Sequence, residues 1–317
     1  MKRIIKVLCR PFLLLGIPFT WLSSVWLKFV MKTGPGNISD KIFMRTGILP
    51  VLDHYYQPLI NPRKHLTRSL RNDRELPGID MNTAGQLALL SKFDFTDELV
   101  KFPLEKKGET EFYYKNNSYE SGDAEYLYNI IRYFKPKTLI EIGSGYSTLM
   151  AKNAIDKNKT DPMYTCRHIC IEPYEQPWLE KTGVSLIREK VENIEKKLFR
   201  ELEANDILFI DSSHIIRPQG DVLFEYLELL PLLKPGVIIH VHDIFTPKDY
   251  PDEWIYSHKL WNEQYLLEAF LTLNTEFIII GALNYLAHNH PNELAATCPM
   301  FARQPGREPG AFWIKRK

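Results

Sequence analysis

Short apolar runs alternate with stretches of helical periodicity through the last two hundred residues of the chain. Runs of this length, rich in Ile, Val, Leu and Phe, are typical of strands buried on both faces of a parallel sheet. The alternation therefore predicts an α/β fold in which helices connect and cover the strands. The predicted strands are residues 139–142, 168–173, 185–187, 205–211, 236–243, 277–281 and 311–314, and helices are expected over 121–134, 149–155, 198–202, 220–230 and 260–273.

The first predicted strand ends in a tight glycine turn that leads into a helix. Gly143 and Gly145 allow close backbone approaches that a Cβ would prevent, and Ser147 or Thr148 can cap the helix that follows. A turn of this kind, at the carboxyl end of a first strand, is where open α/β sheets hold a nucleotide-like ligand.

Glu141, two residues before the first glycine, indicates which ligand. The P-loop pattern is absent, and Thr148 stands where a dinucleotide-binding turn has its third glycine. A carboxylate at this place repels a pyrophosphate and favours a cationic ligand. The alternatives are a strand-turn-helix without a ligand and another nucleotide-binding fold.

Over about residues 118–317 the chain resembles the class I S-adenosylmethionine-dependent methyltransferases, whose first motif is E/D-x-G-x-G. The resemblance implies a Rossmann-like seven-stranded mixed sheet, with the last strand antiparallel and helices on both faces. It implies S-adenosyl-L-methionine as the cofactor. The residues expected to contact this cofactor are Glu141, Gly143, Ser144, Gly145, Ser147, Glu172 and Asp211.

Glu172 ends the second predicted strand, where a ribose would present its two hydroxyls. One carboxylate can accept hydrogen bonds from both hydroxyls, although an ordinary charge at a strand end is the alternative. Tyr119 and Ser121 precede a predicted helix that lies near the cofactor in the resembling family, and they can equally serve as packing and capping residues. Glu192 is a further candidate, for an adenine contact.

Polar residues that can carry chemistry follow the fourth and fifth predicted strands. Asp211 and Asp243 end strands that the resemblance places side by side, about 4.8 Å apart. Two carboxylates so close repel each other unless a cation lies between them or one is protonated. His214 and His242 are near them in sequence. A divalent metal there would lower the pKa of an acceptor hydroxyl, and a histidine would remove its proton.

This arrangement resembles the metal-dependent sugar O-methyltransferases that act on macrolide glycosides, which have D-x-x-H after strand four and an acidic pair after strand five. The match implies that Asp211 and Asp243 are metal ligands and that His214, with Asp211, is catalytic. His242 stands where the family often has a second acid. As a ligand it would favour Mn, Fe or Zn over Mg, yet strand alternation sends it and Asp243 to opposite faces. Without a metal, the two aspartates would contact cofactor or acceptor directly.

Residues 11–27 carry no charge and are flanked by basic residues, while residues 1–33 contain six Lys and Arg and no acid. The segment is at the lower limit for a membrane-spanning helix, and Pro11, Gly16 and Pro18 weaken it as a straight helix. We expect residues 1–33 to attach to an anionic membrane surface. A true span and an arm in an oligomer interface are the alternatives. Because S-adenosylmethionine is made in the cytosol, the catalytic domain is expected on the cytoplasmic face.

The remaining segments contain fewer signals of structure or function. Residues 33–37 read as a linker, and residues 34–117 as a cap that shapes a substrate cleft, in which His54, Tyr55 and Tyr56 could contact an acceptor or simply pack. His288-Asn289-His290 is expected in a solvated loop. Residues 118–317 form the predicted methyltransferase domain. The four cysteines are expected to be reduced thiols.

Composition narrows the function further. A formal charge of +1 argues against a nucleic-acid partner. The favoured function is methyl transfer to a hydroxyl of a small molecule or glycan, such as a sugar in a glycolipid, a polysaccharide or a glycosylated small molecule, with a homo-oligomer left open. The rivals are a metal-dependent hydroxylase on a related fold and a non-catalytic scaffold attached to a membrane.

Overall fold

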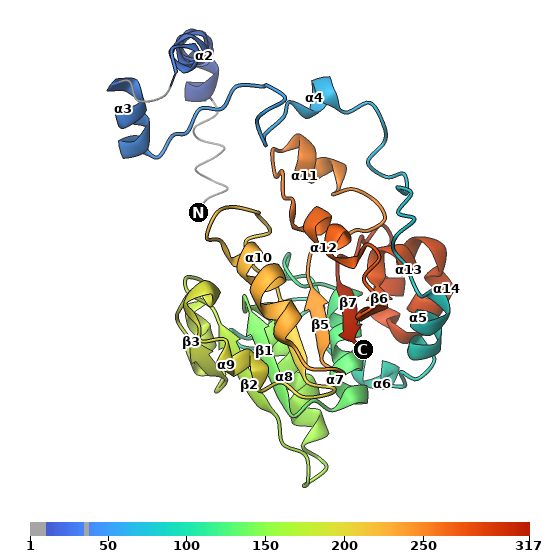
Figure 1. Ribbon diagram of the computed structural model, residues 1–317. Coiled ribbons are helices and arrows are strands. Elements are labelled where there is room, and N and C mark those ends of the chain that lie inside the picture. The colour runs from blue at the N-terminus through green and yellow to red at the C-terminus, as the bar shows by residue number, and fades with distance from the viewer. Residues whose placement is uncertain (1–10, 35–37) are drawn as a thin grey trace. The chain divides into compact units, whose positions relative to one another are not determined.

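The structure is a computed structural model that describes residues 11–34 and 38–317. The chain forms two compact units, one ending at Arg68 and one running from Ser69 to Lys317. The first unit contains the helices α2 (Ile17–Lys32), α3 (Ile38–Thr46) and α4 (Pro62–His65), and the second contains the sheet (Figure 1). The boundary between the units falls inside the segment that the sequence assigned to the cap.

The second unit is built on one seven-stranded sheet with the order β3-β2-β1-β4-β5-β7-β6. Strands β1 to β5 pair in parallel, and β7 pairs antiparallel to both β5 and β6. This confirms the predicted mixed sheet with a reversed last strand. The strands are β1 (Thr138–Ile142), β2 (Arg167–Ile171), β3 (Ser185–Ile187), β4 (Ile207–Ile210), β5 (Ile238–Val241), β6 (Phe277–Ala282) and β7 (Phe312–Arg316).

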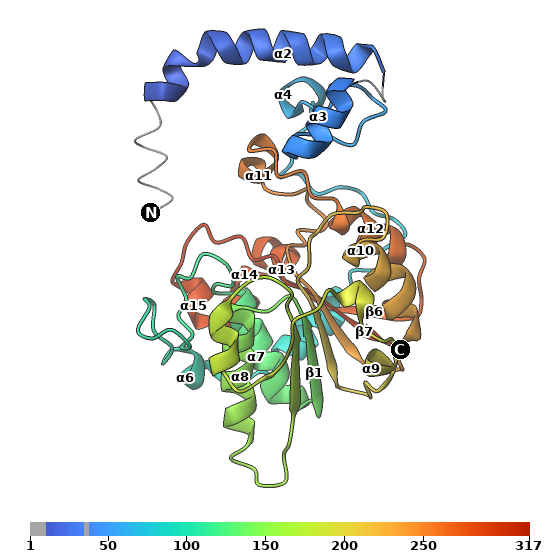
Figure 2. The same ribbon diagram turned by 90° about the vertical axis from the view of Figure 1, so that its left-hand side faces the viewer.

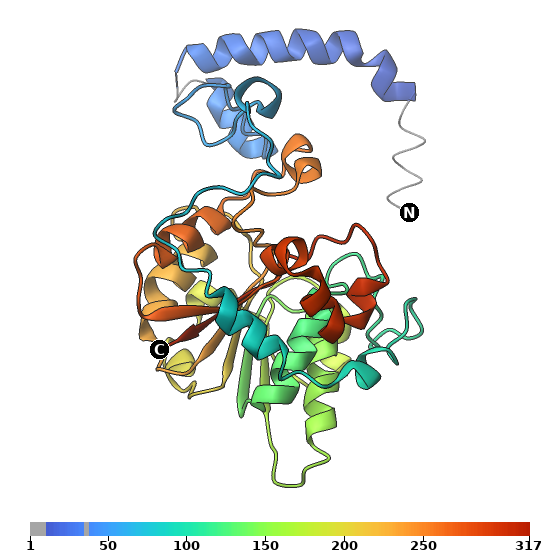
Figure 3. The same ribbon diagram turned by 90° about the vertical axis from the view of Figure 1, so that its right-hand side faces the viewer.

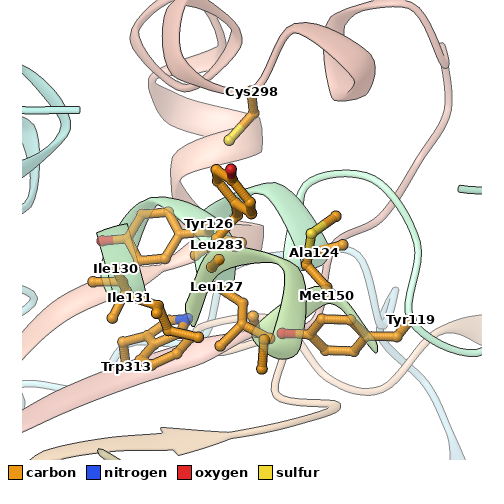
Figure 4. Packing of buried hydrophobic residues seen from close by; sticks show 14 of the residues in the cluster. Tyr119, Ala124, Tyr126, Leu127, Ile130, Ile131, Met150, Leu283, Cys298 and Trp313 are labelled. Atoms are coloured by element: carbon orange, nitrogen blue, oxygen red, sulfur yellow. The ribbon is translucent and has the colours of Figure 1, made fainter. Parts of the chain in front are cut away.

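Helices cover both faces of this sheet, with α7 and α8 on one face and α9, α10 and α12 on the other (Figure 2). Alternate residues of β1 serve the two sides: Leu139 packs in the cluster under α7 and α8, whereas Ile140 packs in the opposite cluster. Figure 4 shows the first cluster, where Leu127 and Ile131 of α7 lie near Trp313 of β7. The helices of this unit are α5 (Thr83–Leu90), α6 (Thr96–Leu99), α7 (Asp123–Phe134), α8 (Tyr146–Asn158), α9 (Lys197–Arg200), α10 (Asp221–Phe224), α11 (Asp252–Tyr256), α12 (Glu263–Leu271), α13 (Leu283–Asn289), α14 (Pro291–Thr297) and α15 (Pro299–Ala302), with 3₁₀ turns at Pro177–Lys181, Val191–Asn193 and Leu230–Leu232 and a π turn at Glu225–Leu229.

Two predicted stretches differ in the structure. The expected helix over 220–230 is a short α-helix followed by the π turn and then a 3₁₀ turn that contains Pro231, because a proline donates no backbone hydrogen bond. The connection from β6 to β7, expected as a solvated loop, holds three helices. His288 lies in α13, and its Nε2 is 3.0 Å from Glu308 Oε2.

The segment around α5 closes one edge of the sheet. Asn82 donates from Nδ2 to the carbonyl of Ile279, at 2.8 Å, and Gln86 accepts the N–H of Ala282, at 2.7 Å. Both partners belong to the edge strand β6, whose unpaired backbone groups would otherwise be open to another chain. In Figure 3 the teal α5 lies beside this edge. The segment that holds Asn82 and α5 therefore covers this edge of the sheet.

Helix α2 of the first unit presents many large apolar side chains to solvent. Its proline lies in the first turn, where no intrahelical donor is lost. Among the described helices, none is both long enough and apolar enough to cross a bilayer. Four of the six basic residues in the N-terminal segment lie outside the described residues. The exposed apolar residues of α2 are Ile17, Phe19, Trp21, Leu22, Val25, Trp26 and Phe29, and Phe12, Leu13, Leu14 and Leu15 before this helix are exposed as well.

Candidate functional site

The glycine turn after β1 presses directly against the end of β4. Gly143 has φ +76°, and a Cβ placed there would lie 1.8 Å from the carbonyl oxygen of Asp211. The Asp211 N–H donates to the carbonyl of Ile142, at 2.8 Å. Only glycine tolerates both the backbone angle and the contact. The turn thus fixes Asp211 beside the place where the resembling family holds its cofactor.

Two cavities lie along this corner, at the carboxyl ends of the parallel strands. The first, of about 320 Å³, is lined by residues of β1, β2 and the loops after β3 and β4. The second, of about 470 Å³, takes in the glycine turn, the loops after β4 and β5, and two tryptophans. They share Gly143, Glu172, Glu175, Asp211, Ser212 and Ser213 as lining residues. The shared wall makes them two ends of one site.

Glu172 lies where a ribose ligand was expected. Its Oε1 accepts the N–H groups of Tyr174 and Glu175, at 2.8 Å each. Its Oε2 has a single long contact, 3.4 Å from the N–H of Ser144. The two short bonds orient the carboxylate, and Oε2 keeps capacity to accept from a ligand hydroxyl. Glu192, the adenine candidate, lines the first cavity only.

Glu141 is not brought to either cavity. Its side chain is fully buried on the α8 face of β1, because alternation along the strand turns it away from Ile142, which lines the first cavity. Its carboxylate accepts from Thr148 Oγ1 and from His168 Nε2, the latter at 3.0 Å. In this structure Glu141 therefore lines neither of the two cavities. The residue ties β1 and β2 to the first turn of α8.

Of the remaining cofactor candidates, four line the second cavity and one does not. Ser144, Gly145, Ser147 and Tyr119 line the second cavity. Ser121 does not, since it is buried and its Oγ donates to Gln304 Oε1, at 2.8 Å. The acceptor candidates His54, Tyr55 and Tyr56 belong to the first unit, where their rings pack on one another.

His214 lies among three carboxylates. Its Nδ1 is 2.7 Å from Glu263 Oε2, and since a carboxylate only accepts, Nδ1–H is the donor. Its Nε2 is 3.2 Å from Asp211 Oδ1 and 3.7 Å from Asp243 Oδ2. His214 and Asp243 have φ of +60° and +56°, which is uncommon for residues other than glycine. Such backbone strain concentrates at functional sites, and it brings both side chains to one point.

Within this cluster, the pKa of His214 and the pKa of Asp211 shift in opposite directions. Burial acts to lower the pKa of His214, but its bonds to Asp211 and Glu263 and the charge of Asp243 raise that pKa well above the ordinary value. Enclosure acts to raise the pKa of Asp211, but His242 and His214 hold it well below the ordinary value. An imidazolium between two carboxylates offsets their mutual repulsion.

The same atoms form a group that fits a divalent cation. The ligand atoms of Asp211, His214 and Asp243 all lie within 4.8 Å of one another. His242, the expected third ligand, is not in this group. Its Nδ1 is 3.9 Å from Asp243 Oδ1 and its ring packs against Tyr119. His214 rather than His242 supplies the nitrogen, giving a mixed nitrogen and oxygen set.

Sequence reasoning missed the residues that position His214. Glu263 lies 49 residues further along the chain and is fully buried at the start of α12, where its second oxygen accepts from the hydroxyl of Tyr226, at 3.2 Å. The ring of Trp261 lies 4.2 Å from that of His214. The only sequence signal for Glu263 is an acid in the first turn of an amphipathic helix, and it does not identify a partner.

Comparisons with known proteins found a family match in the part of the chain that holds this site. Residues 140–244, which hold the glycine turn, Glu172, Asp211, His214 and Asp243, match a family model described as a methyltransferase domain. A protein of Archaeoglobus fulgidus, described as uncharacterized, is 30% identical over 166 residues, which are 49% of this chain and 74% of that protein.

Solved structures of low similarity were also found. One is the plantazolicin methyltransferase BpumL in complex with SAH, 16% identical, covering 62% of this chain and 83% of that one, with a TM-score of 0.38. Another is an O-methyltransferase from Bacillus cereus in complex with SAH, 12% identical, covering 73% of this chain and 91% of that one, with a TM-score of 0.30.

Proposed function

The chain belongs to the class I S-adenosylmethionine-dependent methyltransferases, and on that premise we propose that it transfers the methyl group to an acceptor hydroxyl, with His214 as the general base. The observation that carries the proposal is the fixed position of His214. Glu263 holds its Nδ1, and Nε2 faces Asp211 and Asp243 in the cavity that also contains the glycine turn.

The proposed chemistry needs little from the protein beyond placement and proton removal. The methyl group of a sulfonium is already activated, so in-line positioning of the acceptor oxygen supplies much of the rate. The oxygen forms a bond to the methyl carbon, the carbon–sulfur bond breaks, and its electron pair stays on sulfur as S-adenosylhomocysteine. Once Nε2 of His214 has released its own proton, it takes the proton of the acceptor, while Nδ1–H keeps its hydrogen bond to Glu263.

A divalent cation in this site is an alternative to His214 as the base. Asp211, Asp243 and His214 would hold it, and it would lower the pKa of the acceptor hydroxyl. If His214 is a ligand, its Nε2 is not available as the base. The alternative without a metal is that the imidazolium itself offsets the two aspartates. Dialysis against EDTA distinguishes them: loss of activity that Mn²⁺ or Mg²⁺ restores supports the metal, and undiminished activity excludes it.

For the acceptor and the place of action we propose a glycan or glycosylated lipid at the cytoplasmic face of a membrane. The support is the exposed apolar surface of α2, the resemblance in the D-x-x-H segment to sugar O-methyltransferases, and the tryptophans in the wall of the second cavity. A homo-oligomer stays a prediction.

Calorimetric titration with S-adenosylhomocysteine tests the cofactor, and a labelled-methyl screen on membrane and glycan extracts tests the transfer. We expect the wild type to bind S-adenosylhomocysteine. It should also transfer the labelled methyl group to a hydroxyl of the acceptor, which gives a methyl ether that is stable to mild base. H214A should retain ligand affinity within about threefold and lose at least about a hundredfold in turnover, since general-base catalysis contributes about 10²–10⁴-fold. Loss of both properties in H214A would contradict the assignment of the base.

A further inference from the structure

Lys259 is held between two tryptophans in the wall of the second cavity. Its Nζ is 3.9 Å from the ring centroid of Trp254 and 4.0 Å from that of Trp261. The two indoles meet at 74°, so their faces form a corner around the ammonium. All three residues line the cavity that contains His214. Ring faces attract a cation within about 6 Å of the centroid, so the corner fixes the position of this charge.

The backbone ties this corner to the candidate catalytic turn. The N–H of Lys259 donates to the carbonyl of Trp254, at 2.8 Å, which closes the end of α11. The N–H of Asn262, next to Trp261, donates to the carbonyl of His214, at 3.1 Å. The Trp261 ring lies 4.2 Å from the His214 ring. Lys259 Nζ is therefore no more than about 8.2 Å from the centre of that imidazole, the two centroid separations added.

The charge of Lys259 stands out in this cavity. Among the lining residues it is the only Lys or Arg, and it faces a lining that includes Glu172, Glu175, Asp211 and Asp243. Within residues 11–34 and 38–317, the contacts of its ammonium are the two indoles and no salt bridge to a carboxylate. Indole faces supply no hydrogen-bond acceptor oxygen, so the three N–H donors of the ammonium keep capacity for a ligand.

We propose that Lys259 selects an acceptor that carries an anionic group, a carboxylate, phosphate or sulfate, beside the hydroxyl that is methylated. The inference rests on the proposed function, because it takes His214 as the point where that hydroxyl binds. With the hydroxyl at His214, the distance to Lys259 suits one sugar ring with one charged substituent. The rest of the lining includes four carboxylates, so the fixed ammonium also favours one orientation of an anionic acceptor.

Matched probes test this selection. The probes are methyl β-D-glucuronoside, the 6-phosphate and the 6-sulfate of methyl β-D-glucoside, and the neutral methyl β-D-glucoside. Their affinities are measured by calorimetry on the full chain saturated with S-adenosylhomocysteine. We expect the wild type to bind at least one anionic probe about tenfold more tightly than the neutral one, the size of one charge-assisted hydrogen bond.

Three variants locate the effect. K259M keeps an apolar stem between the indoles and should abolish the preference, whereas K259R should keep most of it. K315M is the control, because Lys315 also lies over an aromatic ring, that of Phe134, but outside the cavity. Its preference should match that of the wild type. Equal binding of all four probes by the wild type, or an unchanged preference in K259M, would overturn the inference. A failure of the proposed function would give a different result, because S-adenosylhomocysteine itself would then not bind to the wild type.

Discussion

At the scale of single residues, the site depends on one imidazole whose two nitrogens have different partners. Glu263 accepts from Nδ1, and the aspartates face Nε2. The carboxylate is fully buried, and an unpaired buried charge is costly, so the pair is expected to stay together through the reaction. Glu263 acts through His214 and is a positioning residue.

We expect E263Q to lower kcat at least about tenfold while leaving KM and S-adenosylhomocysteine affinity within about threefold. The amide can still accept from Nδ1–H but carries no charge to stabilise the imidazolium that forms as the proton is taken. Steady-state kinetics with calorimetry measures this split.

E268Q is the matched control, because Glu268 lies on the same helix and pairs with Arg74 and Thr246 instead. It should cost stability and leave kcat of the folded enzyme nearly unchanged. An equal fall in kcat for both variants would mean that Glu263 acts only by holding α12 in place.

At the scale of elements, the β1–α8 corner depends on the absence of a side chain at Gly143. We expect G143A to destabilise the second unit by well over 3 kcal/mol or to prevent folding, because the new methyl group overlaps the Asp211 carbonyl in addition to the cost of the left-handed backbone.

G183A provides the comparison at nearly the same backbone angle. Gly183 has φ +77° and open space where its Cβ would lie, so its cost should be about 1–2 kcal/mol. Urea unfolding of both variants gives the difference. Equal costs would show that the contact with Asp211 relaxes and does not fix the corner.

A buried glutamate at the start of α7 is expected to make the stability of the fold depend on pH. Glu125 accepts N–H groups of Gly122, Met300 and Phe301, yet burial outweighs these donors and raises its pKa to about 7 from 4.5. The folded state thus binds an extra proton between those values, and this part of the stability falls as pH rises from about 5 to 7.5. We expect the loss to approach about 3 kcal/mol.

The measurement is urea unfolding of the wild type and E125Q across that pH range. Glutamine copies the neutral acid, so the difference between the two proteins should shrink or reverse toward pH 8 in favour of E125Q. Parallel curves for the two proteins would show that Glu125 titrates near its ordinary pKa.

The helices and strands that could be predicted from the sequence are those whose conformation is determined by their own residues. The seven strands were predicted from apolar runs, the reversed last strand was implied by the resemblance to the methyltransferase family, and the structure has both. The three helices between β6 and β7 did not, since their periodicity is short and broken by Pro291 and Pro299. Similarly, Asp211 and His214 are close in sequence and were predicted together, whereas Glu263 and Lys259 reach the site only through tertiary packing. The burial of Glu141 on the α8 side of β1 could not be predicted, because a motif gives a position on a strand but not the face of the sheet to which the side chain points.

At the scale of the whole molecule, the first unit carries an apolar surface that its own described residues leave uncovered. Trp21 and Trp26 of α2 are 65% and 60% exposed, and Lys28 and Lys32 follow on the same helix. This exposed apolar surface, next to basic residues, is the observation behind the proposed attachment to a membrane interface. We expect the full chain to sediment with vesicles containing about 30% anionic lipid, and less with neutral ones, because each Lys near the surface contributes about 1 kcal/mol.

Substitutions in α2 distinguish vesicle binding through this surface from nonspecific binding of the protein. W21E/W26E should lower vesicle binding at least about tenfold, because burying each indole contributes on the order of 2 kcal/mol and a carboxylate is repelled by anionic lipid. L273E is the control, since Leu273 is 83% exposed and belongs to the second unit. It should bind as the wild type does. If the wild type stays in the supernatant with anionic vesicles, the membrane attachment is wrong, and a concentration-dependent mass in solution would instead assign α2 to contacts between copies of the chain.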